Sequence, residues 1–117
     1  MGLSTHVLDT MHGCPAAGMK VELYTLLEGA ATLVRRLTLS QDGRSPGGPL
    51  YADGELKKGI YRLVFDVAAY FKERGVALPE PNFLDRVTLD FGVANPAQHY
   101  HVPLLVSPWS YSTYRGS

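Results

Sequence analysis

The fold is decided by a run near the C-terminal end, His99-Tyr100-His101-Val102-Pro103-Leu104-Leu105-Val106-Ser107, which a turn at Pro108-Trp109 separates from 110–115. Side chains alternate between two faces along a β-strand. Every second residue from Tyr100 to Val106 is apolar, which predicts a core-facing surface. His99 and His101 project from the opposite face, about 7 Å apart. Two titratable rings on a non-core face indicate a site, although solvated surface histidines are the alternative.

The composition limits what kind of protein this can be. The 117 residues suit one domain, 1–117, and the eleven basic residues are balanced by eleven acidic ones. This balance does not favour binding to nucleic acid or to a membrane surface, and no apolar stretch approaches the roughly 20 residues that span a bilayer. Residues 1–6 lack a secretory pattern, and the single cysteine, Cys14, cannot form an internal disulfide. We therefore expect a soluble, cytoplasmic protein.

Short alternating segments between glycines and prolines are typical of an all-β fold. A tight reversal is expected at Glu28-Gly29, and Thr10–Pro15 has the composition of a turn. Asp66 is expected to be the N-cap of the only helix, which runs to Arg74. Alternation predicts strands over 3–9, 19–26, 32–38, 59–66, 85–91, 99–107 and 110–115, with a very short one over 49–52. About eight short strands most plausibly form two packed sheets.

The candidate chemistry lies on the outward faces of three of these strands. His6 is outward on the first strand, and on the last strand Ser112 and Tyr114 share one side while Arg115 takes the other. If the three strands adjoin, their imidazoles, phenol and hydroxyl form one polar surface. Imidazole exchanges protons near neutral pH, and a nearby arginine can hold negative charge developing on a carbonyl oxygen. These groups suffice for general-base attack of water on an activated amide.

Each residue also has a simpler interpretation. Taken singly, His6 or Arg44, which lies in the turn-rich segment 40–48, is better explained as solvated surface. The imidazoles of His6, His99 and His101 could bind zinc, but no acid is obviously placed to support them, so neither a metal nor a cofactor is expected. Nucleophilic catalysis by a serine is also weakly supported, because no serine lies in a nucleophile-elbow context.

Several segments of the sequence resemble a known family. The matching segments, in order, are 3–9 with 13–16, Asp42-Gly43-Arg44, 59–66 with Tyr70-Phe71, 99–105 and Tyr111–Ser117. Together they resemble the 5-hydroxyisourate hydrolase branch of the transthyretin-like protein family, over essentially the whole chain. The terminal Tyr-Arg-Gly-Ser is the most specific element, because it separates the hydrolases from the hormone carriers.

The resemblance implies a transthyretin (prealbumin-like) sandwich of two four-stranded sheets with one short helix, assembled as a homotetramer with sites at the dimer–dimer interface. It implies hydrolysis of 5-hydroxyisourate to 2-oxo-4-hydroxy-4-carboxy-5-ureidoimidazoline in urate degradation, a part of purine metabolism, without a metal or cofactor. The implied catalytic residues are His6, Arg44, His101 and Ser117. The implied substrate-binding residues are His6, Arg44, His99, Tyr114 and Arg115.

The roles of these residues follow from their chemistry. His6 or His101 activates water and then protonates the leaving nitrogen, and His101 is the better candidate for this chemistry. His99 more plausibly orients the site, while Arg44 binds the carbonyl-rich substrate and Tyr114 narrows the pocket. The alternatives are a non-enzymatic small-molecule carrier of the transthyretin type, a zinc hydrolase and a plain interaction domain.

Overall fold

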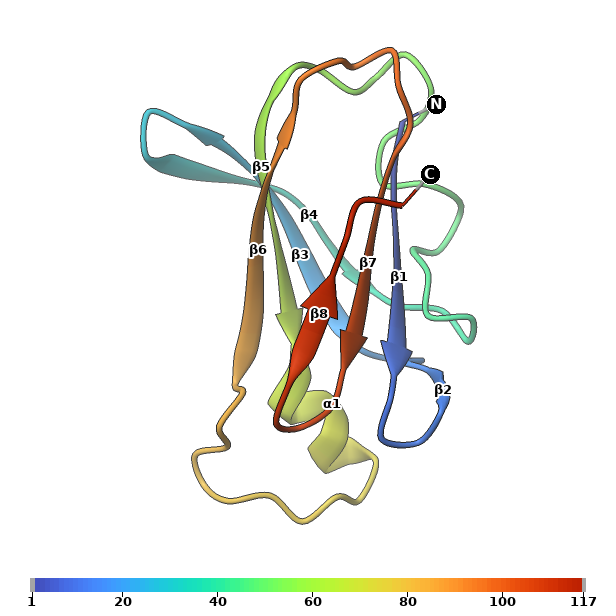
Figure 1. The fold of residues 1–117 in the computed structure, drawn as a ribbon, viewed down its shortest axis with the longest axis vertical. Helices are drawn as coiled ribbons and strands as arrows, with labels where there is room; N and C mark the ends of the chain where they lie inside the picture. The colour runs from blue at the N-terminus through green and yellow to red at the C-terminus, as the bar shows by residue number, and fades with distance from the viewer. Residues whose placement is uncertain (1, 117) are drawn as a thin grey trace.

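The computed structural model describes residues 2–116, which form two packed four-stranded sheets and one short helix (Figure 1). This confirms the predicted sandwich. The elements are β1 (Leu3–Asp9), β2 (Cys14–Pro15), β3 (Lys20–Leu27), β4 (Ala30–Thr38), β5 (Gly59–Asp66), α1 (Val67–Glu73), β6 (Arg86–Val93), β7 (Tyr100–Val106) and β8 (Tyr111–Thr113). Among the described residues, no helix is long and apolar enough to cross a membrane.

The first sheet has the strand order β2-β1-β7-β8 and contains the candidate chemistry. Strands β1 and β7 run parallel, with Leu3 beside Tyr100 at one end and Asp9 beside Val106 at the other. Strand β8 returns antiparallel to β7, pairing Leu105 with Ser112. The three strands that carry the predicted polar side chains are therefore neighbours, as the polar-surface hypothesis requires.

The second sheet, β4-β3-β5-β6, is antiparallel throughout. The reversal between β3 and β4 is the predicted one: Glu28 and Gly29 both have positive φ, at 50° and 80°, as a two-residue hairpin loop of this twist requires. The alternation predicted for 32–38 is interrupted, because a register shift opposite Leu23 and Tyr24 leaves Val34 as an extra residue. Val34 is exposed, and it lies in the middle of β4, where its neighbours are also largely exposed.

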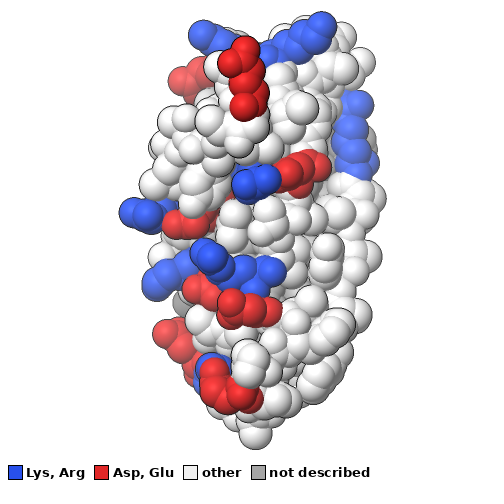
Figure 2. All heavy atoms as spheres, turned by 90° about the vertical axis from the view of Figure 1, so that its left-hand side faces the viewer, with Lys and Arg blue, Asp and Glu red and all other residues white. Residues whose placement is uncertain are grey.

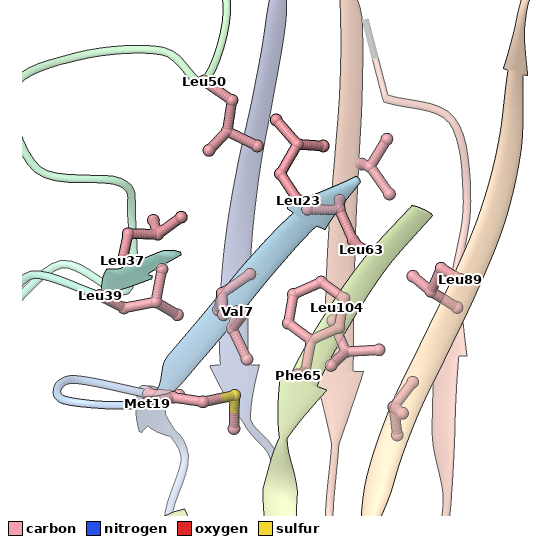
Figure 3. Close-up of a cluster of buried hydrophobic side chains, with 14 of the residues drawn as sticks. Val7, Met19, Leu23, Leu37, Leu39, Leu50, Leu63, Phe65, Leu89 and Leu104 are labelled. Atoms are coloured by element: carbon pink, nitrogen blue, oxygen red, sulfur yellow. The ribbon is translucent and has the colours of Figure 1, made fainter. Parts of the chain in front are cut away.

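The core lies between the two sheets and is built from the faces that period-two alternation predicts. Figure 3 shows Val7 and Leu104 of the first sheet directed toward Leu23, Leu63 and Phe65 of the second. All five side chains are fully buried. Burying a side chain of this kind contributes about 1.5–3 kcal/mol, so the alternation of β1 and β7 fixes which of their faces points outward.

Four local predictions need correction. Cys14 and Pro15 form the short strand β2 against β1 rather than part of a turn, because Ala16 N–H donates to the Val7 carbonyl at 2.9 Å. Asp66 occupies the N-cap of α1, but its side chain makes no capping hydrogen bond. The last strand is only Tyr111–Thr113, and segment 49–52 contributes a single bridge, from Tyr51 to Leu3.

The outer surface carries both signs of charge. Cross-strand ion pairs join Arg36 to Glu22 at 2.8 Å and Arg62 to Asp90 at 2.7 Å on the second sheet. Figure 2 shows basic and acidic side chains interspersed over one side of the molecule, without a patch of one sign. This face does not have the continuous basic surface that nucleic-acid binding uses.

Candidate active site

Three polar side chains meet on the outward face of the first sheet because of the parallel register of β1 and β7. Ser4 lies opposite His101, and its Oγ is 2.8 Å from His101 Nδ1 and 3.1 Å from His99 Nε2. The two imidazole rings are nearly parallel, at 11°, with centroids 6.5 Å apart. One hydroxyl therefore connects the two histidines that the alternation placed on this face.

Arg44 is positioned by a tight backbone contact with β1. Gly43 has a φ of 71°, its carbonyl accepts a hydrogen bond from Val7 N–H at 3.0 Å, and a Cβ there would lie 2.6 Å from the Val7 carbonyl oxygen. Only glycine fits this position without strain. The next residue, Arg44, forms a β-bridge with His6 while its side chain remains exposed. Segment 40–48 thus places the Arg44 guanidinium beside the histidine surface.

On this surface, His6 and His101 favour the neutral form of the imidazole. Partial burial and the positive charge of Arg44 lower the pKa of His6 below its ordinary 6.5, although a hydrogen bond with the Asp42 backbone opposes the change. Burial, Arg44, His6 and His99 all lower the pKa of His101. At pH 7 both imidazoles are therefore neutral and can accept a proton.

The segment after β8 returns to β7 beside His101. Gly116 N–H donates to the His101 carbonyl at 2.7 Å, and a Cβ on Gly116 would lie 2.7 Å from the His101 ring. The Arg115 guanidinium stacks 3.9 Å from the Tyr100 ring and donates to the His99 carbonyl at 3.1 Å. Glycine at 116 allows close approach to the imidazole, and Arg115 fastens the segment.

A cavity of about 490 Å³ adjoins the histidines and is lined by His99, Tyr114, Arg115 and Gly116. Tyr114 is 60 % exposed at its wall. The structure thus brings His6, His99, His101 and Arg44 together on one sheet face. The Arg115 guanidinium instead stacks on the core-facing Tyr100 ring, and Arg115 and Tyr114 meet the site through the cavity wall that they share with His99. Ser117, the remaining predicted site residue, lies outside the described residues.

Two points of the sequence interpretation change with this geometry. Among residues 2–116, no group of three His, Cys, Asp or Glu side chains is arranged to hold a metal ion, which gives the zinc alternative no structural support. Ser4 was missed as a site residue. It lies two residues before His6 on the same strand face, so period-two alternation could have found it.

A second polar cluster lies at the other end of β1. Asp9 is fully buried, and its carboxylate accepts hydrogen bonds from His12 N–H at 2.9 Å and from Tyr70 Oη at 2.8 Å, while His12 Nδ1 lies 2.6 Å away. Burial alone would raise the pKa of Asp9, but these bonds outweigh it and leave the pKa below 3.8. Arg74 of the helix end lies 3.3 Å from the Tyr70 hydroxyl. This cluster joins the first sheet to α1.

The arrangement at Ser4, His6, His99, His101 and Arg44 can take a proton from water and hold negative charge on a carbonyl oxygen. Known proteins are similar in sequence to the chain that forms this site. A family profile described as the HIUase/Transthyretin family matches residues 3–116.

Curated relatives match over nearly their full length. The 5-hydroxyisourate hydrolase of Deinococcus radiodurans is 53 % identical over 99 % of this chain and 96 % of its own. The 5-hydroxyisourate hydrolase of Pseudomonas aeruginosa is 50 % identical over 98 % of this chain and 90 % of its own.

Solved structures have the same fold. A crystal structure of (S)-allantoin synthase superposes with a TM-score of 0.92 and 47 % identity, over 99 % of this chain and 43 % of that chain, so this chain spans less than half of that protein. Sea bream transthyretin in complex with thyroxine superposes with a TM-score of 0.83 and 26 % identity, over 99 % of this chain and 95 % of that chain.

Proposed function

The chain belongs to the HIUase/Transthyretin family, and from this membership we propose that it is an enzyme that hydrolyses 5-hydroxyisourate, yielding 2-oxo-4-hydroxy-4-carboxy-5-ureidoimidazoline in urate degradation. The observation that carries the proposal is the pair of neutral histidines, His6 and His101, beside the Arg44 guanidinium on one sheet face. Curated relatives of about half identity bear the name of this activity.

His101 is the residue we assign to proton transfer. Its Nδ1 is engaged with Ser4, which leaves Nε2 for water or substrate. As a neutral imidazole it can accept a proton from the attacking water, so that hydroxide adds to the ring carbonyl of the substrate. Its Nε2–H can then return the proton to the departing nitrogen as the ring opens. General acid–base transfer of this kind contributes about 10²–10⁴-fold to a rate.

The negative charge that develops on the carbonyl oxygen needs a cation, and Arg44 supports that role. Its exposed guanidinium lies close enough to lower the pKa of both His6 and His101. We assign His6 to substrate contact and to a share of the proton chemistry. Tyr114 and His99 line the cavity that would hold the ring, and Arg115 keeps this wall in place. Ser117 is proposed to close the pocket.

We propose that the protein acts as a homotetramer with its sites where two dimers meet. In the monomer the histidine face is the outer surface of a sheet, and Tyr114 stands largely exposed on it. A second dimer against this face would shelter both. Light scattering coupled to size exclusion should give four times the 12.8 kDa chain mass; a monomer or dimer at micromolar concentration would contradict the assembly.

The carrier alternative has less support. The transthyretin solved with thyroxine is 26 % identical to this chain, about half the identity of the curated hydrolases. A carrier has no need of two neutral imidazoles beside a guanidinium, whereas a hydrolase does.

The activity can be tested on freshly generated 5-hydroxyisourate, followed by its ultraviolet absorbance. We expect the protein to accelerate loss of the signal well above spontaneous decay, and to do so after exhaustive dialysis against a strong chelator. Decay at the spontaneous rate would contradict the proposed function. Full loss of activity on chelation, with recovery on adding zinc, would favour the zinc alternative.

A further inference from the structure

The hydroxyl of Ser4 has an unusual position, because it lies between two imidazoles. Its Oγ is within hydrogen-bonding distance of both His101 Nδ1 and His99 Nε2. A serine hydroxyl carries one proton, so it donates to one ring and accepts from the other. The tautomers of the two histidines are therefore coupled through Ser4.

Only two neutral arrangements satisfy both contacts. In the first, His101 Nδ1–H donates to Ser4 and Ser4 donates to His99 Nε2, which leaves a lone pair on His101 Nε2. In the second, His99 Nε2–H donates to Ser4 and Ser4 donates to His101 Nδ1, which places the proton of His101 on Nε2. The first arrangement leaves His101 Nε2 as a base, and the second makes it an acid.

Resting on the function proposed above, we propose that Ser4 is a positioning residue that relays a proton between His101 and His99, and so sets whether His101 acts as base or acid. When His101 Nε2 accepts a proton from water, its Nδ1 proton passes to Ser4 Oγ while the Ser4 proton passes to His99 Nε2. His101 stays neutral and His99 becomes the imidazolium. The reverse transfer restores both rings when His101 Nε2–H protonates the leaving nitrogen.

The surroundings of His101 fit this relay. Beside it stand Arg44 from the loop after β4, His6 of β1 and His99 on its own segment, and each of them disfavours a positive charge on His101. A relay moves the charge one ring away from Arg44 and His6. Ser4 and His101 lie opposite each other on the paired backbones of β1 and β7, and His99 directly precedes β7, which keeps the hydroxyl between the two rings.

The test compares Ser4→Ala with Ser4→Thr, which keeps the hydroxyl and suits a strand. Thr5→Val is the matched control, because it removes a neighbouring hydroxyl that bonds the Val102 carbonyl on the core side of the same two strands. We expect Ser4→Ala to lower kcat about 10-fold or more with KM little changed and to move the acid limb of the pH–rate profile. Ser4→Thr should recover most of the rate, and Thr5→Val should keep the wild-type profile.

Nitrogen-15 NMR of the free protein reads the tautomers directly, without substrate. The relay predicts that Ser4→Ala changes the tautomer populations of both His99 and His101, whereas Thr5→Val changes neither. If the wild type is active and Ser4→Ala leaves kcat, the pH profile and the tautomer populations unchanged, the relay is overturned and the proposed function stands. A wild type that does not accelerate 5-hydroxyisourate decay would overturn the relay together with the proposed function.

Discussion

Strand β1 carries a polar cluster at each end, and the two are built in opposite ways. At its start, Ser4 and His6 face outward beside His101, half-buried, with no carboxylate bonded to either imidazole among the described hydrogen bonds. At its end, Asp9 is fully buried and its carboxylate is bonded by His12 and Tyr70. We refer to these as the histidine cluster and the Asp9 cluster.

The comparison separates chemistry from structure. Hydrogen bonds to the Asp9 carboxylate stabilise its charged form, so the cluster is satisfied within the fold and fastens the sheet to α1. The histidine cluster instead has lowered pKa values and nitrogens left for an external partner. A group whose proton affinity is altered and that keeps a nitrogen for an external partner is the better candidate for catalysis.

The largest expected effect comes from exchanging a histidine in each cluster for asparagine. His6→Asn should lower the turnover of 5-hydroxyisourate about 100-fold or more, because it removes an acid–base group beside Arg44. His12→Asn is the control and should retain turnover while lowering thermal stability. Equal loss of turnover in both variants would remove the distinction between the two clusters.

The glycine beside His101 offers the next effect. Gly116→Ala places a methyl group 2.7 Å from the His101 ring, so either the ring or the returning segment must shift. Misplacing a reacting group by about 1 Å can cost about 10²-fold, and we expect a loss of about 10- to 100-fold in kcat. Unchanged kinetics, with unfolding also unchanged, would show that the approach of Gly116 to His101 has no functional role.

The two clusters should also differ in their pH windows. The pKa values of His6 and His101 lie below 6.5 when folded, so kcat/KM should be level above about pH 6.5 and fall at lower pH as the imidazoles protonate, by about tenfold per unit for each histidine that must be neutral. The pKa of Asp9 is also lowered, so its contribution to stability is present above 3.8 and is lost as the pH falls through its folded value. Activity should thus fail at a higher pH than the fold does. Simultaneous loss of activity and structure would contradict this order.

The smallest effect concerns stability alone. Tyr70→Phe removes one hydrogen bond to the buried Asp9 carboxylate, which should lower the free energy of unfolding by about 1–3 kcal/mol. Turnover per folded molecule should remain at the wild-type value. Urea unfolding and the absorbance assay measure the two quantities, and a fall in turnover without a fall in stability would be the contrary result.

The sequence predicted what alternation and chemistry determine locally. The inward faces of β1, β5 and β7, the hairpin at Glu28-Gly29 and the two-sheet architecture followed from period two and turn composition. The alternation showed which side chains of the three polar strands face outward, but it did not show that these strands are neighbours. The family and its site residues came from the resemblance.

The remaining features depend on contacts between distant segments. The strand at Cys14-Pro15 exists because Leu8 and Asp9 pair with it, whereas its own composition is that of a turn. The bridge from Ser4 to both histidines needs the parallel register of β1 and β7, which places residues 97 positions apart in contact. No local pattern encodes that register.

If the histidine cluster hydrolyses 5-hydroxyisourate, a single substitution in it should abolish most of the rate. The decay of freshly generated 5-hydroxyisourate is followed by ultraviolet absorbance with no protein, with wild type and with His101→Asn at equal concentration, after circular dichroism has shown that the variant is folded. We expect strong acceleration by wild type, and for His101→Asn a rate at least about 100-fold lower than that of wild type. Spontaneous decay with wild type, or near-wild-type acceleration by His101→Asn, would contradict this expectation.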